Sequence, residues 1–194
     1  MLKTTDNINI LYEVIPIRLF LIVMLVFYHA FAIFSGAWSP VAGYPEIQLY
    51  NIMDKLSYAC LLETFVFISG YIFGFQYNKK KGYILETRSF FVGKFKRLIL
   101  PSFLFSILYI LVFQEYDKPI VTIVYNILCG TGHMWFLPML FWCFVFISLA
   151  EKTRISDKYM TFILIIMLFI SVLPLPFRID TAMYFLYFFT LVIA

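Results

Sequence analysis

The sequence predicts an all-α protein, a polytopic transmembrane helical bundle with about five complete spans and a partial sixth. Hydrophobic residues make up 63% of the 194 residues and charged residues only 13%. This composition leaves too little polar surface to cover a water-soluble globule of that size. The apolar residues also fall into long stretches separated by short polar ones, which is typical of a chain that crosses a bilayer several times.

Six apolar stretches define the expected spans, at residues 17–38, 54–77, 98–113, 134–150, 159–173 and 181–194. Residues 1–16 have no apolar core followed by a small-residue cleavage site, so we expect the first span to be retained rather than removed as a signal peptide. The last stretch is short: its residues form ~21 Å of helix against a ~30 Å hydrocarbon core. We therefore expect residues 1–194 to be a single transmembrane domain that is truncated at its C-terminus.

The distribution of Lys and Arg predicts the orientation. With the N-terminus in the cytoplasm, twelve of the 15 basic residues lie inside, and three lie outside, Lys55, Lys118 and Arg178. This is a strong positive-inside bias. We expect an integral membrane protein that contacts the lipid bilayer on all sides, with its N-terminus in the cytoplasm.

Arg18 and His29 stand at the two ends of the first apolar run. Eleven α-helical residues end about 20° past three full turns, so both side chains leave the same face roughly 16 Å apart. Ionisable groups inside a membrane helix are costly and mark a functional site by default. The pair predicts a polar track that runs inward from the cytoplasmic surface.

A basic segment, residues 78–97, carries most of the net charge of +4. Near its end, Lys94, Lys96 and Arg97 crowd the start of a span. Such residues can simply fix topology and contact anionic headgroups. They can also form a phosphate-binding surface, and on an α-helix Lys94 and Arg97 would share one face.

The second span contains Glu63, followed by Ser69, Gly70 and Gly74. A carboxylate at this depth needs a partner or a proton, so we expect Glu63 either to pair with His29 or to stay protonated. The G-x-x-x-G spacing favours close helix packing. Ser69 lies outside a strand-to-helix elbow, so packing or a hydrogen bond to the backbone is expected rather than a nucleophilic role.

His133 and Trp135 follow Gly130 and Gly132 at an expected outer loop. Trp at a membrane interface is ordinary anchoring. Glycines directly before a His and a Trp also suit the mouth of a pocket. The cysteines, Cys60, Cys129 and Cys143, have no paired spacing and read as buried hydrophobic residues, and we expect no metal site.

Four motifs together resemble the acyltransferase type 3 family of integral membrane acyltransferases, over essentially the whole chain. They are Arg18-x10-His29, the string Phe67–Tyr71, the basic entry Lys94–Pro101 and the string His133–Pro138. The resemblance implies about ten spans in a complete member, of which this chain is similar to the N-terminal half. It also implies transfer of acetyl or similar groups from cytoplasmic acyl-CoA to a surface glycan in the bacterial inner membrane.

The resemblance assigns roles residue by residue. It makes His29 catalytic, and Glu63 is a second catalytic candidate in the membrane. It places Arg18, Lys94, Lys96 and Arg97 at the donor, and His133 and Trp135 on the acceptor side. Acyl-CoA is then a donor substrate, no bound cofactor is expected, and a glycan rather than a nucleic acid is the partner.

The chain departs from the family pattern at two positions. Lys94 stands where Arg is common, which keeps the charge but loses the bidentate fork, and Val14 replaces an acidic residue. Two other functions stay open. The chain can be part of a transporter or glycan exporter in which Arg18, Glu63 and His29 form a substrate or proton pathway, or a non-catalytic interaction partner.

Overall fold

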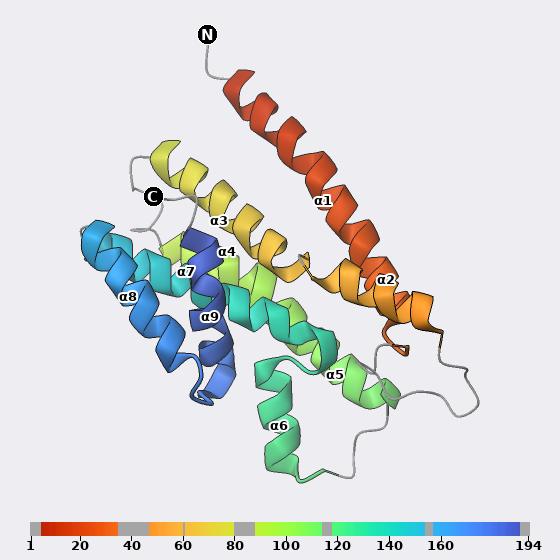
Figure 1. Cartoon of the computed structure of the whole chain (residues 1–194). Coiled ribbons are helices and arrows are strands. Elements are labelled where there is room, and N and C mark those ends of the chain that lie inside the picture. Colours follow the sequence, from red (N-terminus) through yellow and green to blue (C-terminus); the bar gives the residue numbers. More distant parts are fainter. Residues whose placement is uncertain are drawn as a thin grey trace. The chain divides into compact units, whose positions relative to one another are not determined.

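The computed structural model describes residues 5–34, 47–59, 61–79, 88–113, 118–153 and 157–190, and every regular element in these ranges is a helix (Figure 1). The expected all-α class is therefore confirmed for this part of the chain. Several sequence predictions lie outside the described residues: those for Cys60, the basic residues of the loop at 80–87, and the ends of the first and last expected spans at Trp38 and Ala194.

The chain divides into two compact units, residues 1–69 and 70–194. In the first unit, α1 (Thr5–Phe31) packs on α2 (Gln48–Tyr58), and the first half of α3 (Leu61–Lys79) follows. Helix α1 begins well before the expected start of the first span and continues through Pro16, which cannot donate a hydrogen bond to the carbonyl of Tyr12. One helix therefore carries both Arg18 and His29, so the eleven-residue spacing between them applies.

Helix α2 has its polar face turned inward. Asp54 is 3% exposed and Ser57 is buried, whereas Leu49 and Leu56 are exposed. Such an arrangement is the reverse of a helix in water, and it suits a helix whose apolar face meets lipid. Aromatic rings fasten the polar face to α1, with Tyr28 stacked 4.8 Å from Tyr58 between ring centroids.

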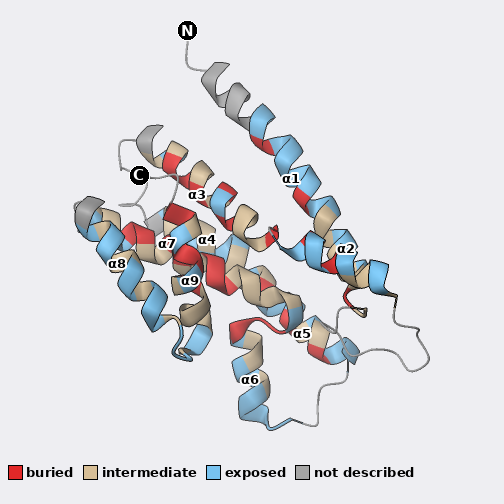
Figure 2. Ribbon diagram, in the orientation of Figure 1, coloured by how far each residue is buried: buried red, intermediate tan, exposed pale blue. Residues whose placement is uncertain are grey.

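The second unit continues α3 and contains the remaining helices. They are α4 (Arg88–Lys94), the π-helix η1 (Phe95–Ile99), α5 (Leu100–Phe113), α6 (Ile120–Cys129), the 3₁₀-helix η2 (Gly132–Trp135), α7 (Phe136–Lys152), α8 (Asp157–Ile170), the 3₁₀-helix η3 (Pro176–Arg178) and α9 (Ile179–Thr190). Figure 2 shows buried residues concentrated on α7 and α9, while α6 and α8 are largely exposed. Helix α6 was missed by the sequence prediction, because its ten residues are too few for a span.

Phenylalanines form the core of the second unit. The ring centroid of Phe73 lies 5.7 Å from that of Phe144 and 6.0 Å from that of Phe189. A Cβ on Gly70 would collide with the carbonyl oxygen of Phe189, so α3 and α9 approach as closely as glycine allows. This confirms the predicted packing role at Gly70.

Four helical stretches of the described chain are long and apolar enough to cross a membrane: Tyr12–Phe31, Gln48–Tyr77, Ser89–Phe113 and Gly132–Lys152. They match the first four expected spans in place. Helices α8 and α9, in the positions of the fifth and sixth, have 14 and 12 residues and are shorter than a full span. The length and apolar composition of these helices identify an integral membrane protein.

Candidate functional site

His29 lies near the C-terminal end of α1, partly buried, with a defined ring orientation. Its Nδ1 is 2.7 Å from the carbonyl oxygen of Leu25. A carbonyl can only accept, so Nδ1–H donates this bond, and the neutral ring then carries its lone pair on Nε2. The Tyr28 ring meets the imidazole edge-on, 5.2 Å between centroids. The backbone thus prepares His29 to accept a proton at Nε2.

Polar groups of α2 gather beside this end of α1. Asp54 is buried one helical turn before Tyr58, whose ring stacks on Tyr28, the residue before His29. The Oδ1 atoms of Asp54 and Asn51 are buried without a hydrogen-bond partner among the described residues. Buried polar atoms are nearly always satisfied, so a carboxylate in this state calls for an explanation. From the sequence, Asp54 was predicted only as the first residue of a span. Its position four residues before Tyr58, on the same helical face, was the signal that could have placed it beside α1.

Glu63 lies in the first turn of α3, partly buried, five residues after Tyr58. Tyr58 stacks on Tyr28, the residue before His29. The stacked pair therefore connects the segment that contains Glu63 with the segment that contains His29. Ser69 donates a hydrogen bond from Oγ to the carbonyl of Phe65 at 2.8 Å, which confirms its expected backbone role.

The cationic segment of the second unit contains an irregular helix. Pro101 cannot donate to the carbonyl of Arg97, and the backbone widens into the π-helix η1 just before it. The α-helical spacing used to place Lys94 and Arg97 on one face therefore stops at Lys94. The three cations differ in surroundings: Lys96 and Arg97 are exposed, while the Lys94 Nζ lies 3.4 Å from the ring centroid of Phe144.

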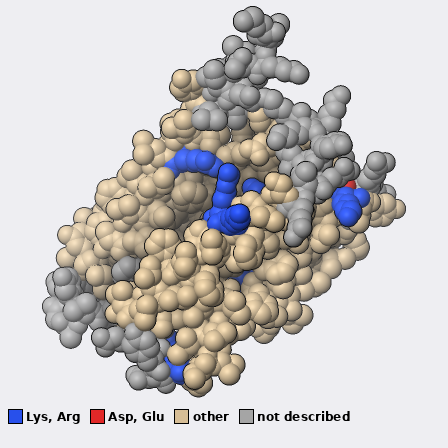
Figure 3. All heavy atoms as spheres, turned by 180° about the vertical axis from the view of Figure 1, so that it is seen from behind, with Lys and Arg blue, Asp and Glu red and all other residues tan. Residues whose placement is uncertain are grey.

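Lys94 is thus held in a cation–π contact beside the phenylalanine core rather than presented to solvent. Lys96 and Arg97 are the better placed of the three to meet an external anion. Figure 3 shows basic side chains gathered on a surface that is otherwise mostly uncharged, with little acidic surface near them. Such a field favours an anionic partner.

Alongside α5, a tight turn at Gly130–Gly132 precedes α7. Gly130 and Gly132 have φ of 81° and 57°, values that favour glycine. The turn docks on a row of serines: the Thr131 N–H donates to Ser106 Oγ at 2.9 Å, and Ser102 Oγ donates to the carbonyl of Met134 at 3.2 Å. The glycines thus fix one wall of a pocket.

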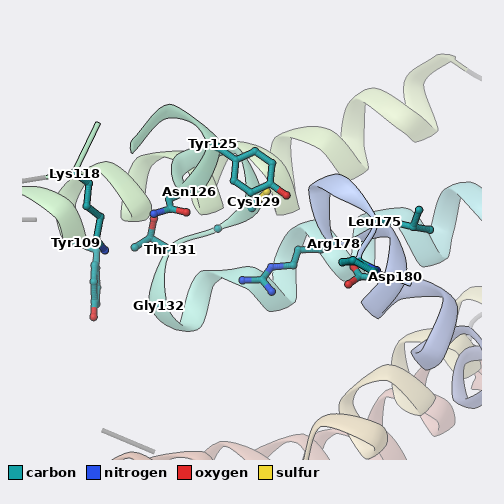
Figure 4. A pocket seen from close by; sticks show the side chains of 12 residues that line it. Tyr109, Lys118, Tyr125, Asn126, Cys129, Thr131, Gly132, Leu175, Arg178 and Asp180 are labelled. Carbon is teal, nitrogen blue, oxygen red and sulfur yellow. The ribbon is translucent and has the colours of Figure 1, made fainter. Parts of the chain in front are cut away.

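This pocket, which we call the Arg178 pocket, encloses about 490 Å³ within the second unit (Figure 4). It is lined by Tyr109, Lys118, Tyr125, Asn126, Cys129, Gly130, Thr131, Gly132, Pro174, Leu175, Arg178 and Asp180. The residues come from the C-terminal part of α5, from the segment just before α6, from α6 and the turn after it, and from the segment that leads into the first turn of α9. The pocket is therefore built where helix ends meet.

Arg178 projects into this pocket toward the Thr131–Gly132 turn (Figure 4). Its guanidinium carbon lies 5.8 Å from the ring centroid of Trp135, and its buried Nε has no hydrogen-bond partner in the described chain. Phe177 and Arg178 both have positive φ, 56° and 63°, which is uncommon for residues other than glycine. Strain of this kind persists where the surroundings demand it and clusters at functional sites.

The expected site residues fall into two groups. Arg18, His29 and Glu63 belong to the first unit, and Lys94, Lys96, Arg97, His133 and Trp135 belong to the second. Trp135 contacts Arg178, which lines the Arg178 pocket. His133 lies in η2, whose first residue, Gly132, also lines the pocket. Nothing in the sequence marked Arg178 as a site residue, because a lone basic residue just after Pro174 and Pro176 is typical of a loop.

The chain was compared with known proteins. It matches the sequence model of a family described as an acyltransferase domain over residues 12–193. Comparisons with curated proteins and with solved structures gave no significant match.

Proposed function

Because this chain belongs to the acyltransferase type 3 family, we propose that it moves an acetyl or similar acyl group from cytoplasmic acyl-CoA to a hydroxyl of a cell-surface glycan. Family membership and the apolar helices identify a membrane acyltransferase in general. The donor and the acceptor are the parts that we propose. The single observation that carries the chemistry is His29, whose Nδ1–H donates to the Leu25 carbonyl and leaves Nε2 as the base.

His29 acts as the general base in this proposal. Its Nε2 takes the proton from the sugar hydroxyl as the hydroxyl oxygen attacks the thioester carbon. The new C–O bond forms, the C–S bond breaks, and the proton on His29 passes to the departing CoA sulfur. An imidazole can both take up and release a proton, so one side chain suits both transfers.

Cations on the cytoplasmic side bind the donor phosphates in this proposal. Lys96 and Arg97 are exposed at η1, and Arg18 is exposed on α1 eleven residues before His29. Arginine pairs with phosphate through two parallel hydrogen bonds, which a lysine cannot provide. Lys94 supports the segment through its contact with Phe144.

The family match favours this function over a transporter in which Arg18, Glu63 and His29 form a proton pathway. The two functions differ in one measurable product. Membranes that contain the chain are incubated with acyl-CoA labelled in its acyl group, and the glycan fraction is analysed for ester-linked label. We expect transfer above that of membranes without the chain. Label that stays in acyl-CoA, together with altered glycan export, would instead indicate transport.

A further inference from the structure

We propose that the Arg178 pocket binds the carboxylate of an acidic sugar in the acceptor, with Arg178 as its pairing cation. The inference rests on the proposed function, since it names the class of acceptor. It is carried by the charge of the pocket, by two unsatisfied polar atoms and by the strained backbone at Arg178.

The lining has an excess of positive charge. Lys118 and Arg178 face a single carboxylate, Asp180. Asp180 is occupied by its own helix: it lies in the first turn of α9, where a negative charge is favourable, and its Oδ1 accepts a hydrogen bond from Thr181 Oγ1 at 3.3 Å. Arg178 is therefore the cation that we assign to an external anion.

Two polar atoms of the pocket are buried and unsatisfied. Thr131 is 8% exposed, and its Oγ1 has no hydrogen-bond partner in the described chain; the same holds for the Nε of Arg178. Leaving such atoms unpaired is costly, and more so when the group is charged. In Figure 4 both side chains belong to the same cavity, with Arg178 directed toward the Thr131 turn. A carboxylate oxygen can accept from both groups at once.

The backbone holds Arg178 in this position at a cost. Positive φ at two successive non-glycine residues, Phe177 and Arg178, is an unfavourable backbone conformation that the surrounding structure must hold in place. The guanidinium carbon also lies 5.8 Å from the ring centroid of Trp135, within cation–π range. A side chain fixed by its backbone and by a ring loses little entropy when it binds, so the arrangement suits recognition of a rigid anion.

The remaining lining suits a sugar rather than a small inorganic anion. Tyr109 and Tyr125 contribute aromatic rings and hydroxyls, and Asn126 contributes an amide. A volume of about 490 Å³ lies within the usual range for small-molecule sites. A hexuronate combines the ring, the hydroxyls and the carboxylate that these groups can bind.

The test measures binding to the full chain in lipid nanodiscs by calorimetry, without any acyl donor. The probes are a hexuronate disaccharide, the matching neutral disaccharide and inorganic phosphate. We expect the hexuronate to bind more tightly than the other two. Arg178→Gln should weaken its affinity about tenfold or more, as expected for loss of a charged hydrogen bond.

Two milder variants keep the proposal falsifiable if Arg178→Gln folds poorly. Thr131→Val removes the hydroxyl at similar volume, and Lys118→Gln changes an exposed residue. Each should weaken hexuronate binding several-fold, whereas Lys152→Gln, an equal loss of charge outside the pocket lining, should leave it unchanged. Equal binding of the neutral disaccharide, equal binding of phosphate, or hexuronate binding that ignores all three pocket variants would overturn the proposal.

This measurement is independent of catalysis. A chain that binds hexuronate but transfers no acyl group would keep the pocket and refute the enzymatic function. A chain that acylates a neutral glycan and does not bind hexuronate would keep the enzymatic function and refute the proposed pocket specificity.

Discussion

Arg18 and His29 stand at the border of the buried stripe of α1. Val14, Leu21 and Ala32 form that stripe, and the helical repeat puts Arg18 about 40° and His29 about 60° from Val14. At this border a side chain can reach a polar partner without being sealed in the core. The shared helical face of the two residues could be predicted from the sequence, because a helix of constant period connects them.

Asp54 gives a prediction at the residue scale. Asp54 lies one helical turn before Tyr58, which stacks on Tyr28, and a carboxylate on this side of α2 would stabilise the imidazolium that forms when His29 accepts a proton. Asp54→Asn removes that charge at similar volume, so acyl transfer should fall several-fold while the amount of protein in the membrane stays the same. Lys55→Gln, which changes the exposed neighbour, is the control and should leave transfer unchanged.

Arg97 gives a second prediction at this scale. Arg97→Ala should weaken acyl-CoA binding about tenfold, because a bidentate phosphate contact is lost, and should leave hexuronate binding unchanged. Equilibrium binding of a fluorescent acyl-CoA to the purified chain measures the effect. A larger effect on the sugar than on acyl-CoA would move the nucleotide elsewhere.

At the level of elements, two glycines in different helices provide a matched pair. A Cβ at Gly70 would strike the Phe189 carbonyl, whereas one at Gly93 would meet nothing within 4 Å. Gly70→Ala should therefore destabilise the fold by about 1–3 kcal/mol through overpacking. Gly93→Ala should raise stability by up to about 1 kcal/mol, because alanine favours the helix. Thermal unfolding in detergent compares the two, and an equal effect would show that α3 and α9 do not pack this closely.

The helices also show which parts of the fold can be predicted from the sequence. Long apolar helices are predictable because composition and length set them, and α5 and α7 fall close to their expected bounds. The π-helix η1 was not predicted, although Pro101 was visible, because the missing hydrogen bond can be absorbed in several ways. The Arg178 pocket was predicted only in part. The glycines indicated the mouth of a pocket, but Arg178 lies in a distant segment of the sequence that only the fold brings to this pocket.

On the scale of the whole molecule, the orientation in the membrane is testable. The positive-inside bias places η1 and Lys152 in the cytoplasm and Lys118 outside. In intact cells, a membrane-impermeant thiol reagent should label Lys118→Cys and spare Lys152→Cys. The native Cys129 and Cys143 are buried, and Cys60 is replaced by Ser in both variants so that it adds no background. Labelling with the opposite pattern would invert the topology and place the Arg178 pocket inside.

The central claim is that His29 is the base of acyl transfer, and two substitutions test it directly. His29→Asn keeps a side-chain N–H that can donate to the Leu25 carbonyl, and His29→Ala removes it; neither supplies a base. We expect both to lower transfer of labelled acyl groups to glycan by about 10²-fold or more, with normal amounts of protein in the membrane. Transfer at the original rate in either variant would contradict the account.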